Sequence, residues 1–219
     1  MNYLLKAVSI LLFSNYVVAA PLQIATSNNL KLLNINYQYL LETAITNAGY
    51  QVEFTEFENA DTLTQSNSGE LDGELYRYSY TMHQYNNLQM IPIKLNSSAL
   101  FVYVPQKSKC PVLQQLADYT PIGVLGVSYF NEFYTASRVG FIEQESITLA
   151  VESLMNKPLS YTIFPVDIVP SLMEFSGIKL RRCYKQPILV LSAYSYLHKK
   201  HADKIEAISR ELNSLLLTS

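Results

Sequence analysis

One arginine in the chain stands where a side chain could bind an anionic ligand. Arg77 ends the run Gly69-Glu-Leu-Asp-Gly-Glu-Leu-Tyr-Arg77. Glycine adopts the positive backbone angles of a tight turn at no steric cost, so a turn at Gly69 and a strand over 71–76 are predicted. Arg77 would then lie at the carboxyl end of that strand, where open α/β sheets bind ligands, and a guanidinium binds a carboxylate through two parallel hydrogen bonds. The alternative is a surface ion pair with Glu70 or Glu74.

Four further side chains are candidates for ligand contact. Asp167 follows a predicted strand and offers a carboxylate, although helix N-capping would by itself explain an aspartate there. Ser128 also follows a predicted strand, where a hydroxyl beside a helix N-terminus suits an anionic group; capping is again the alternative. Tyr80 and Tyr129 would form ring walls of a binding cleft, against ordinary packing or exposure.

The cysteines and histidines have no metal-site pattern. The chain has two cysteines, Cys110 and Cys183, and three histidines, without the spacing of a zinc site. The pair His198 and His201 would need a third ligand. The seven glycines form no phosphate-binding loop, so we expect neither a metal nor a nucleotide cofactor. The two cysteines form either one disulfide, which suits an exported protein, or two separate buried thiols.

The first 19 residues have the pattern of a secretory signal peptide. A positive start with Lys6 precedes a mostly apolar stretch over 7–18, and Val17 and Ala19 occupy the small-residue positions before a cut after Ala19. An uncleaved membrane anchor is the alternative, but the stretch is shorter than the ~20 residues that span a bilayer. No cysteine follows the cut, so a lipid anchor is not indicated. We therefore expect export.

Length and charge narrow the class of protein. A chain of 219 residues, 49% hydrophobic and 16% charged, can bury the core of one or two domains. Its formal net charge of -2 gives no basic surface for nucleic acid, so no nucleic-acid partner is expected. Tyrosine occurs 17 times, and its polar tip suits binding clefts as well as cores.

The order of predicted elements divides the mature chain into two α/β lobes. Strand, helix, strand, helix and strand alternate up to residue 76, which is typical of a parallel sheet covered by helices. Extended runs over 88–95 and 99–104 follow, and the polar segment 105–109 crosses into a second set of strands and helices. The extended run 188–194 would return the chain before a terminal amphipathic helix. We predict lobe 1 over 20–103 and 189–219, and lobe 2 over 104–188.

Several motifs, taken in order, carry a resemblance to a known family. They are Gly69-Glu-Leu-Asp-Gly73 before a strand, Pro92, the apolar run Leu100-Phe-Val-Tyr-Val104, Ile122-Gly-Val124 with Ser128 after it, Asp167, and the ending Tyr194-Ser-Tyr-Leu-His-Lys-Lys-His201. With the export signal, this set resembles the bacterial extracellular solute-binding proteins of family three, the periplasmic proteins of amino-acid-type ABC transporters. The ending is similar to a poorly characterised branch of that family.

The resemblance implies a fold and a mechanism. The fold would be the type II periplasmic-binding-protein fold, with mixed sheets, flanking helices and two crossing hinge strands. A small-molecule ligand would bind between the lobes of a periplasmic monomer, and the closed form would dock on an inner-membrane permease or sensor. In the family an arginine clamps the ligand carboxylate; its usual place holds Thr81-Met-His-Gln84 here, and Arg77 would substitute. Ser128 matches the position that helps hold the anionic end, and Asp167 matches the acidic position that takes an ammonium.

Three functions follow as alternatives. The first is a solute-binding protein that delivers a small polar, carboxylate-bearing solute to an ABC-type importer. The second is a ligand-sensing or orphan interaction protein without a transport role, motivated by the missing family arginine and the missing aromatic platform after the first strand. The third is a dehydratase-like enzyme, for which Glu74, His83 and Asp167 are the candidate acid and base groups, although no spacing unites them. We expect a binding protein rather than an enzyme.

Overall fold

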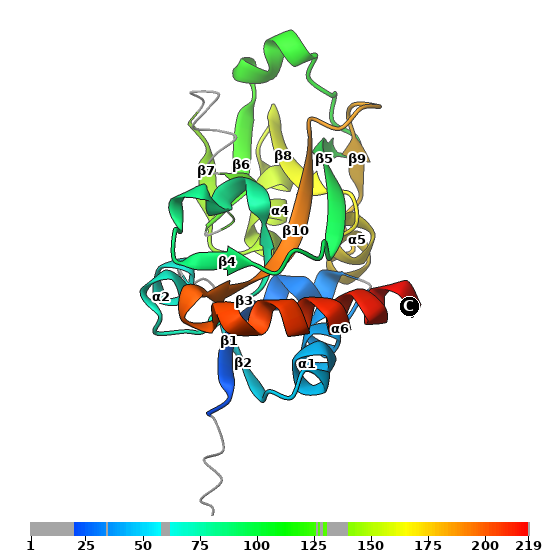
Figure 1. Cartoon of the computed structure of the whole chain (residues 1–219). Coiled ribbons are helices and arrows are strands. Elements are labelled where there is room, and N and C mark those ends of the chain that lie inside the picture. Colours follow the sequence, from blue (N-terminus) through cyan, green and yellow to red (C-terminus); the bar gives the residue numbers. More distant parts are fainter. Residues whose placement is uncertain are drawn as a thin grey trace, which may run out of the picture.

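One mixed sheet runs through the described part of the molecule (Figure 1). The computed structural model describes residues 20–33, 35–57, 62–125, 127, 129–130 and 140–218, so the predicted signal peptide and Ser128 lie outside it. Along the sheet the strands are β2 (Val52–Phe57), β1 (Leu22–Ser27), β3 (Gly73–Tyr78), β10 (Leu189–His198), β5 (Asn96–Pro105), β8 (Ser160–Pro165), β6 (Thr120–Val124) and β7 (Ile142–Gln144). The short strands β4 (Leu88–Met90) and β9 (Leu180–Arg182) pair with β10 and β5.

Helices cover both faces of the lobe 1 sheet. On one face α1 (Tyr37–Asn47) and α6 (Ile205–Thr218) share a hydrophobic cluster with Leu197 of β10. On the other face α2 (Thr62–Ser68) and the 3-10 helix η2 (Ser79–Gln84) pack on Tyr196. The remaining described helices are η1 (Asn28–Leu32), η3 (Leu113–Asp118), α4 (Ile147–Asn156), α5 (Val169–Ser176) and η4 (Lys199–Lys204). None of the described helices is both long and apolar enough to cross a membrane.

Local sequence explains where the first helix begins and ends. The Asn36 side chain caps α1 by accepting a 3.0 Å hydrogen bond from the backbone N–H of Tyr39. Leu41 and Ile45, four residues apart, are fully buried on the same face of the helix. Gly49 follows at φ 87°, a left-handed conformation that favours glycine and ends the helix.

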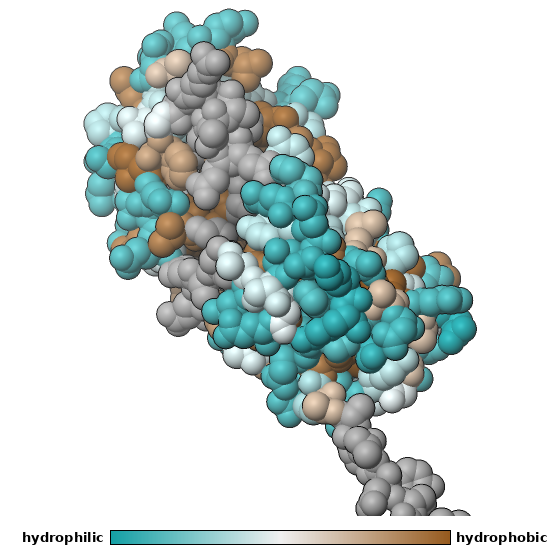
Figure 2. Space-filling model, turned by 60° about the vertical axis from the view of Figure 1, so that its left-hand side comes forward, coloured by the Kyte–Doolittle hydropathy of each residue, from teal (hydrophilic) through white to brown (hydrophobic). Residues whose placement is uncertain are grey.

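Two separate hydrophobic clusters form the cores of the two lobes. The lobe 1 cluster includes Ile24, Leu41 and Ile208. The lobe 2 cluster includes Ile122 and Phe164. The predicted α/β class and two-lobed architecture are therefore confirmed, whereas the exact lobe boundaries stay a prediction. Figure 2 shows a mostly hydrophilic surface over lobe 1, in the lower half of the view, and more scattered apolar residues over lobe 2.

The two long strands β5 and β10 join the lobes into one sheet. They pair antiparallel from Leu189↔Leu100 to Ala193↔Asn96. β5 then pairs with β8 in lobe 2, and β10 with β3 in lobe 1. The sequence predicts that this strand ends at Tyr194, but β10 continues to His198. The buried Ser195 hydroxyl donates a 2.6 Å hydrogen bond to the Leu75 carbonyl there, which fixes this half of β10 on β3.

Asp72 connects the amino-terminal strand to the end of the chain. Its carboxylate accepts hydrogen bonds from the Gln23 backbone N–H at 2.8 Å and from Lys200 Nζ at 2.7 Å, and His201 Nε2 lies 2.6 Å away. Its backbone carbonyl accepts from the His198 N–H at 2.8 Å. Gly73 follows because an added Cβ would lie 2.2 Å from the Tyr196 carbonyl oxygen. The Asp-Gly pair of the motif therefore has a structural role.

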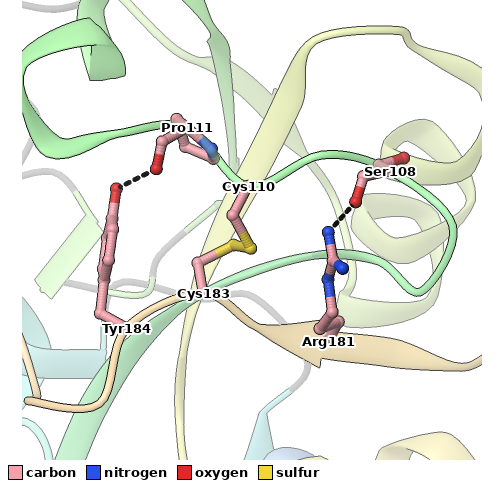
Figure 3. The surroundings of a disulfide bond; sticks show 6 residues. All are labelled: Ser108, Cys110, Pro111, Arg181, Cys183 and Tyr184. Carbon is pink, nitrogen blue, oxygen red and sulfur yellow. Dashed lines mark hydrogen bonds between the residues drawn. A yellow bond between two sulfur atoms is a disulfide. The ribbon is translucent and has the colours of Figure 1, made fainter.

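Cys110 and Cys183 form a disulfide across 73 residues of lobe 2 (Figure 3). It joins the segment after β5 to the segment after β9. On one side the Arg181 guanidinium donates to the Ser108 carbonyl, and on the other the Tyr184 hydroxyl donates to the Pro111 carbonyl at 2.9 Å. The bond and its two flanking hydrogen bonds hold β9 against the exit of β5.

Removal of the disulfide should cost about 4 kcal/mol of unfolding free energy, because a crosslink across a long loop restricts the unfolded chain. The test is urea denaturation of the Cys110→Ser, Cys183→Ser double variant beside the oxidised protein. The control is wild type under reductant, whose transition should move to that of the variant. An unchanged wild-type midpoint under reductant would contradict the expectation.

Acid should destabilise the protein through His198. Burial lowers the pKa of His198 below its ordinary 6.5, and the neighbouring charges of Lys200 and Lys199 lower it further. The unfolded chain therefore binds a proton that the native state resists, so stability is complete above pH 6.5 and is lost as the pH falls toward the lower native pKa. Urea denaturation at pH 7.5 to 5.5 should show this loss, with a smaller slope in His198→Gln and an unchanged slope in the exposed control His83→Gln. Equal slopes in all three proteins would refute the assignment.

Asp72 should add a second loss of stability at lower pH. Burial acts to raise the pKa of Asp72, but hydrogen bonds from Gln23, Lys200 and His201 outweigh it and hold the pKa below its ordinary value. The stability from this depressed pKa is present above about pH 4 and is lost as the pH falls through the native value.

Candidate functional site

Asp167 contacts the long strand β5 at the junction of the two lobes. It lies two residues beyond Pro165, which pairs with Leu100, so the same register places it opposite Ser98. The Ser98 hydroxyl donates to Asp167 Oδ1, and Asn96 Nδ2 donates to Oδ2 at 2.7 Å. The N-cap of α5 is Ile168, without a side-chain capping bond, so Asp167 contacts the hinge strand rather than capping the helix.

A row of tyrosine rings crosses the same junction. We call Tyr37, Tyr76, Tyr78 and Tyr129 the tyrosine row. Ring centroids lie 5.2 Å apart for Tyr37 and Tyr76, 5.6 Å for Tyr76 and Tyr78, and 5.9 Å for Tyr78 and Tyr129. The first three rings come from α1 and β3 in lobe 1, whereas Tyr129 belongs to the lobe 2 cluster. Asn96 Nδ2 also lies 3.1 Å from the Tyr76 hydroxyl, which links the row to Asp167.

The hydroxyls of the row stay neutral. Burial raises the pKa of Tyr37, Tyr78 and Tyr129, and the negative charge of Asp167 adds to each shift. Neutral phenols both donate and accept hydrogen bonds. In the described part of the chain, no lysine, arginine or histidine forms an ion pair with Asp167. The junction therefore presents one carboxylate among aromatic rings and neutral polar groups.

Arg77 lies in a different network, on the α2 side of β3. Its Nε and Nη2 atoms each lie 2.9 Å from Glu74 Oε2, and Nη2 donates a 2.5 Å hydrogen bond to Thr62. Glu74 is 1% exposed and accepts a 2.7 Å bond from the Ser66 hydroxyl. The ion pair with Glu74 is one of the alternatives that the sequence left open. Ligand contact by Arg77 stays a prediction.

Of the other predicted residues, one belongs to the tyrosine row and the rest lie elsewhere. Tyr129 is in the tyrosine row, with its ring 5.9 Å from that of Tyr78. Tyr80 lies in η2, where it is 47% exposed, and it is not part of the row. His83, one of the candidate acid and base groups, also lies in η2, with Nδ1 3.2 Å from the Tyr80 carbonyl. Glu74, His83 and Asp167 thus contact different partners.

A pocket in lobe 1 adjoins the row. It has a volume of about 540 Å³, within the range of small-molecule sites, and Tyr37 and Leu75 form part of its wall. Its charged lining residues are Glu42, Glu56 and Lys31, and Lys31 Nζ forms a 2.7 Å ion pair with Glu56. Tyr37 therefore belongs both to the row and to the pocket.

Comparison with known proteins identifies the fold. No protein-family model matches the sequence, and no curated protein matches it. Among solved structures, the GluR0 ligand-binding core from Nostoc punctiforme in complex with L-glutamate has a TM-score of 0.74 at 14% identity, covering 90% of this chain and 94% of that one. The chain has the type II periplasmic-binding-protein fold. At such identity the likeness establishes the fold alone.

Further structures with this fold include a receptor and a sensor. The solute receptor for L-cysteine of Neisseria gonorrhoeae has a TM-score of 0.70 at 14% identity, covering 89% of this chain and 84% of that one. A histidine kinase sensor domain with similarity to periplasmic binding proteins has a TM-score of 0.76 at 12% identity, with 92% of both chains covered. These neighbours are binding or receptor proteins rather than enzymes.

Sequence reasoning missed most of the row. Tyr76 and Tyr78 alternate on one strand, and this Tyr-x-Tyr spacing at a strand end was the available signal. Tyr37 on α1 gave no such signal. Asn96 and Ser98 also alternate on β5, but only the pairing with β8 shows that both face Asp167.

Glu74→Ala should destabilise the protein by about 3 kcal/mol, because it leaves the partly buried guanidinium of Arg77 without its counter-charge. The matched control is Glu70→Ala at an exposed position, which should change the unfolding free energy by at most about 0.5 kcal/mol. Urea denaturation measures both. Equal effects of the two variants would show that the Glu74–Arg77 pair contributes nothing to stability.

Proposed function

We propose that the chain is an exported binding protein that holds a small polar solute between its two lobes. The observation that carries this proposal is Asp167, a half-buried carboxylate at the lobe junction. Asn96 links it to the tyrosine row, and it has no cationic partner among the described residues. Half-buried charges are costly unless they are paired, so this one favours a ligand. The fold, with two hinge strands, supplies the lobes that would close on it.

The sequence predicts a small polar solute with a carboxylate, and the resemblance implies an ammonium at Asp167. The ammonium has a partner in Asp167. The predicted partners of the ligand carboxylate are Arg77, whose guanidinium pairs with Glu74, and Ser128. Delivery of the solute to an ABC-type importer in the inner membrane is the role that the resemblance implies.

A ligand-sensing role is the second candidate. The likeness to a histidine kinase sensor domain, over 92% of both chains, favours it. Gene neighbourhood separates the two roles: an adjacent permease gene supports transport, and an adjacent gene for a membrane-bound sensor enzyme supports sensing.

The function predicts that a small molecule stabilises the native protein. Native mass spectrometry of the exported protein should find a co-purified small molecule. A thermal-shift screen of amino acids, amines, organic acids and small peptides should raise the melting temperature by about 5–10 °C at a hundredfold excess over the dissociation constant, because the ligand binds only the folded state. Absence of both a co-purified molecule and any shift would end the solute-binding proposal.

A further inference from the structure

The charges at the lobe junction indicate which ionic group the solute carries. A carboxylate has about four positions that accept hydrogen bonds, and Asn96 and Ser98 fill two of those of Asp167. The described residues supply no positive charge to it. The guanidinium of Arg77 is neutralised by Glu74 on the other side of β3. A carboxylate on the ligand would therefore meet Asp167 without a described counter-charge, whereas an ammonium would be attracted.

Two buried tyrosine hydroxyls at the junction lack a hydrogen-bond partner among the described residues. Tyr37 is 3% exposed and Tyr129 is 6% exposed, and no hydrogen bond joins either hydroxyl to another described residue. Buried polar groups are usually hydrogen-bonded, so two hydroxyls that no described residue bonds indicate a place for a polar ligand group. The Tyr37 ring contacts Tyr76, whose hydroxyl lies 3.1 Å from the Asn96 amide that also bonds Asp167, and the Tyr129 ring contacts Tyr78.

The aromatic rings and the adjoining pocket favour the same sign of charge. A cation is attracted to the face of an aromatic ring, and four rings line this junction. Among the described residues, the charged groups that line the 540 Å³ pocket sharing Tyr37 are the carboxylates of Glu42 and Glu56 and one lysine that pairs with Glu56. A chain-like ligand that extends from Asp167 toward this pocket would meet a second negative charge.

We propose that the solute is an organic amine without a carboxylate, with its ammonium on Asp167 and its carbon chain among the rings of the tyrosine row. This inference rests on the proposed function and names its ligand class. It replaces the amino-acid type of ligand with one in which the carboxylate is absent.

The test compares each amine with the amino acid that differs from it only by a carboxylate. The probes are agmatine and arginine, cadaverine and lysine, and tyramine and tyrosine, titrated calorimetrically into the ligand-free mature protein with its disulfide intact. At least one amine should bind tenfold or more tightly than its amino acid. Equal or tighter binding by the amino acids would overturn the inference, as would binding of only organic acids or peptides, and both results would leave the proposed function standing. No binding by any compound in the wider screen would overturn both.

Variants test the residues themselves. Asp167→Asn keeps the size of the side chain and removes its charge, so amine binding should weaken at least tenfold; the exposed control Asp118→Asn should bind as wild type does. Tyr37→Phe removes a hydroxyl that no described residue bonds, so the melting temperature should stay the same while amine binding weakens severalfold. Wild-type affinity in both Asp167→Asn and Tyr37→Phe would overturn the assignment of this site.

Discussion

The antiparallel pairing of β5 with β10 is the constraint on which the rest of the molecule depends. Five residue pairs, from Leu189↔Leu100 to Ala193↔Asn96, hold the two lobes in one sheet. Because side chains alternate along a strand, Asn96 and Ser98 share one face of β5. The pairing of β5 with β8 then brings Asp167 opposite them. The register of two long strands thus sets the geometry of the candidate site.

The carboxylates of Glu74 and Asp167 differ in their partners. Glu74 is fully buried, and its charge is balanced by Arg77 and supported by Ser66. Removing one partner of such a pair destabilises the folded protein, so Arg77 is expected to stay paired with Glu74 rather than bind a ligand. Asp167 is half-buried and accepts only neutral donors among the described residues. The first carboxylate has a structural role, and the second is the one to which we assign the ammonium of the solute.

The tyrosine row joins the two lobes through ring contacts. Tyr78 from lobe 1 and Tyr129 from lobe 2 contact edge to face at 5.9 Å. Their rings line the junction, and their hydroxyls stay neutral because burial raises their pKa. Tyrosine suits this junction better than phenylalanine, because phenylalanine has a ring of similar size but cannot form a side-chain hydrogen bond.

The sequence by itself determined most of the longer helices and strands, the α/β class and the two lobes, because helix spacing, turn glycines and caps such as Asn36 act over a few residues. It also gave Asp167 and Tyr129 as candidates for ligand contact, and that contact stays a prediction. Only the tertiary structure decided that Arg77 pairs with Glu74, and that Tyr37 lies beside Tyr76. These contacts depend on strand register and on helix packing between segments far apart in the chain, which no local pattern encodes.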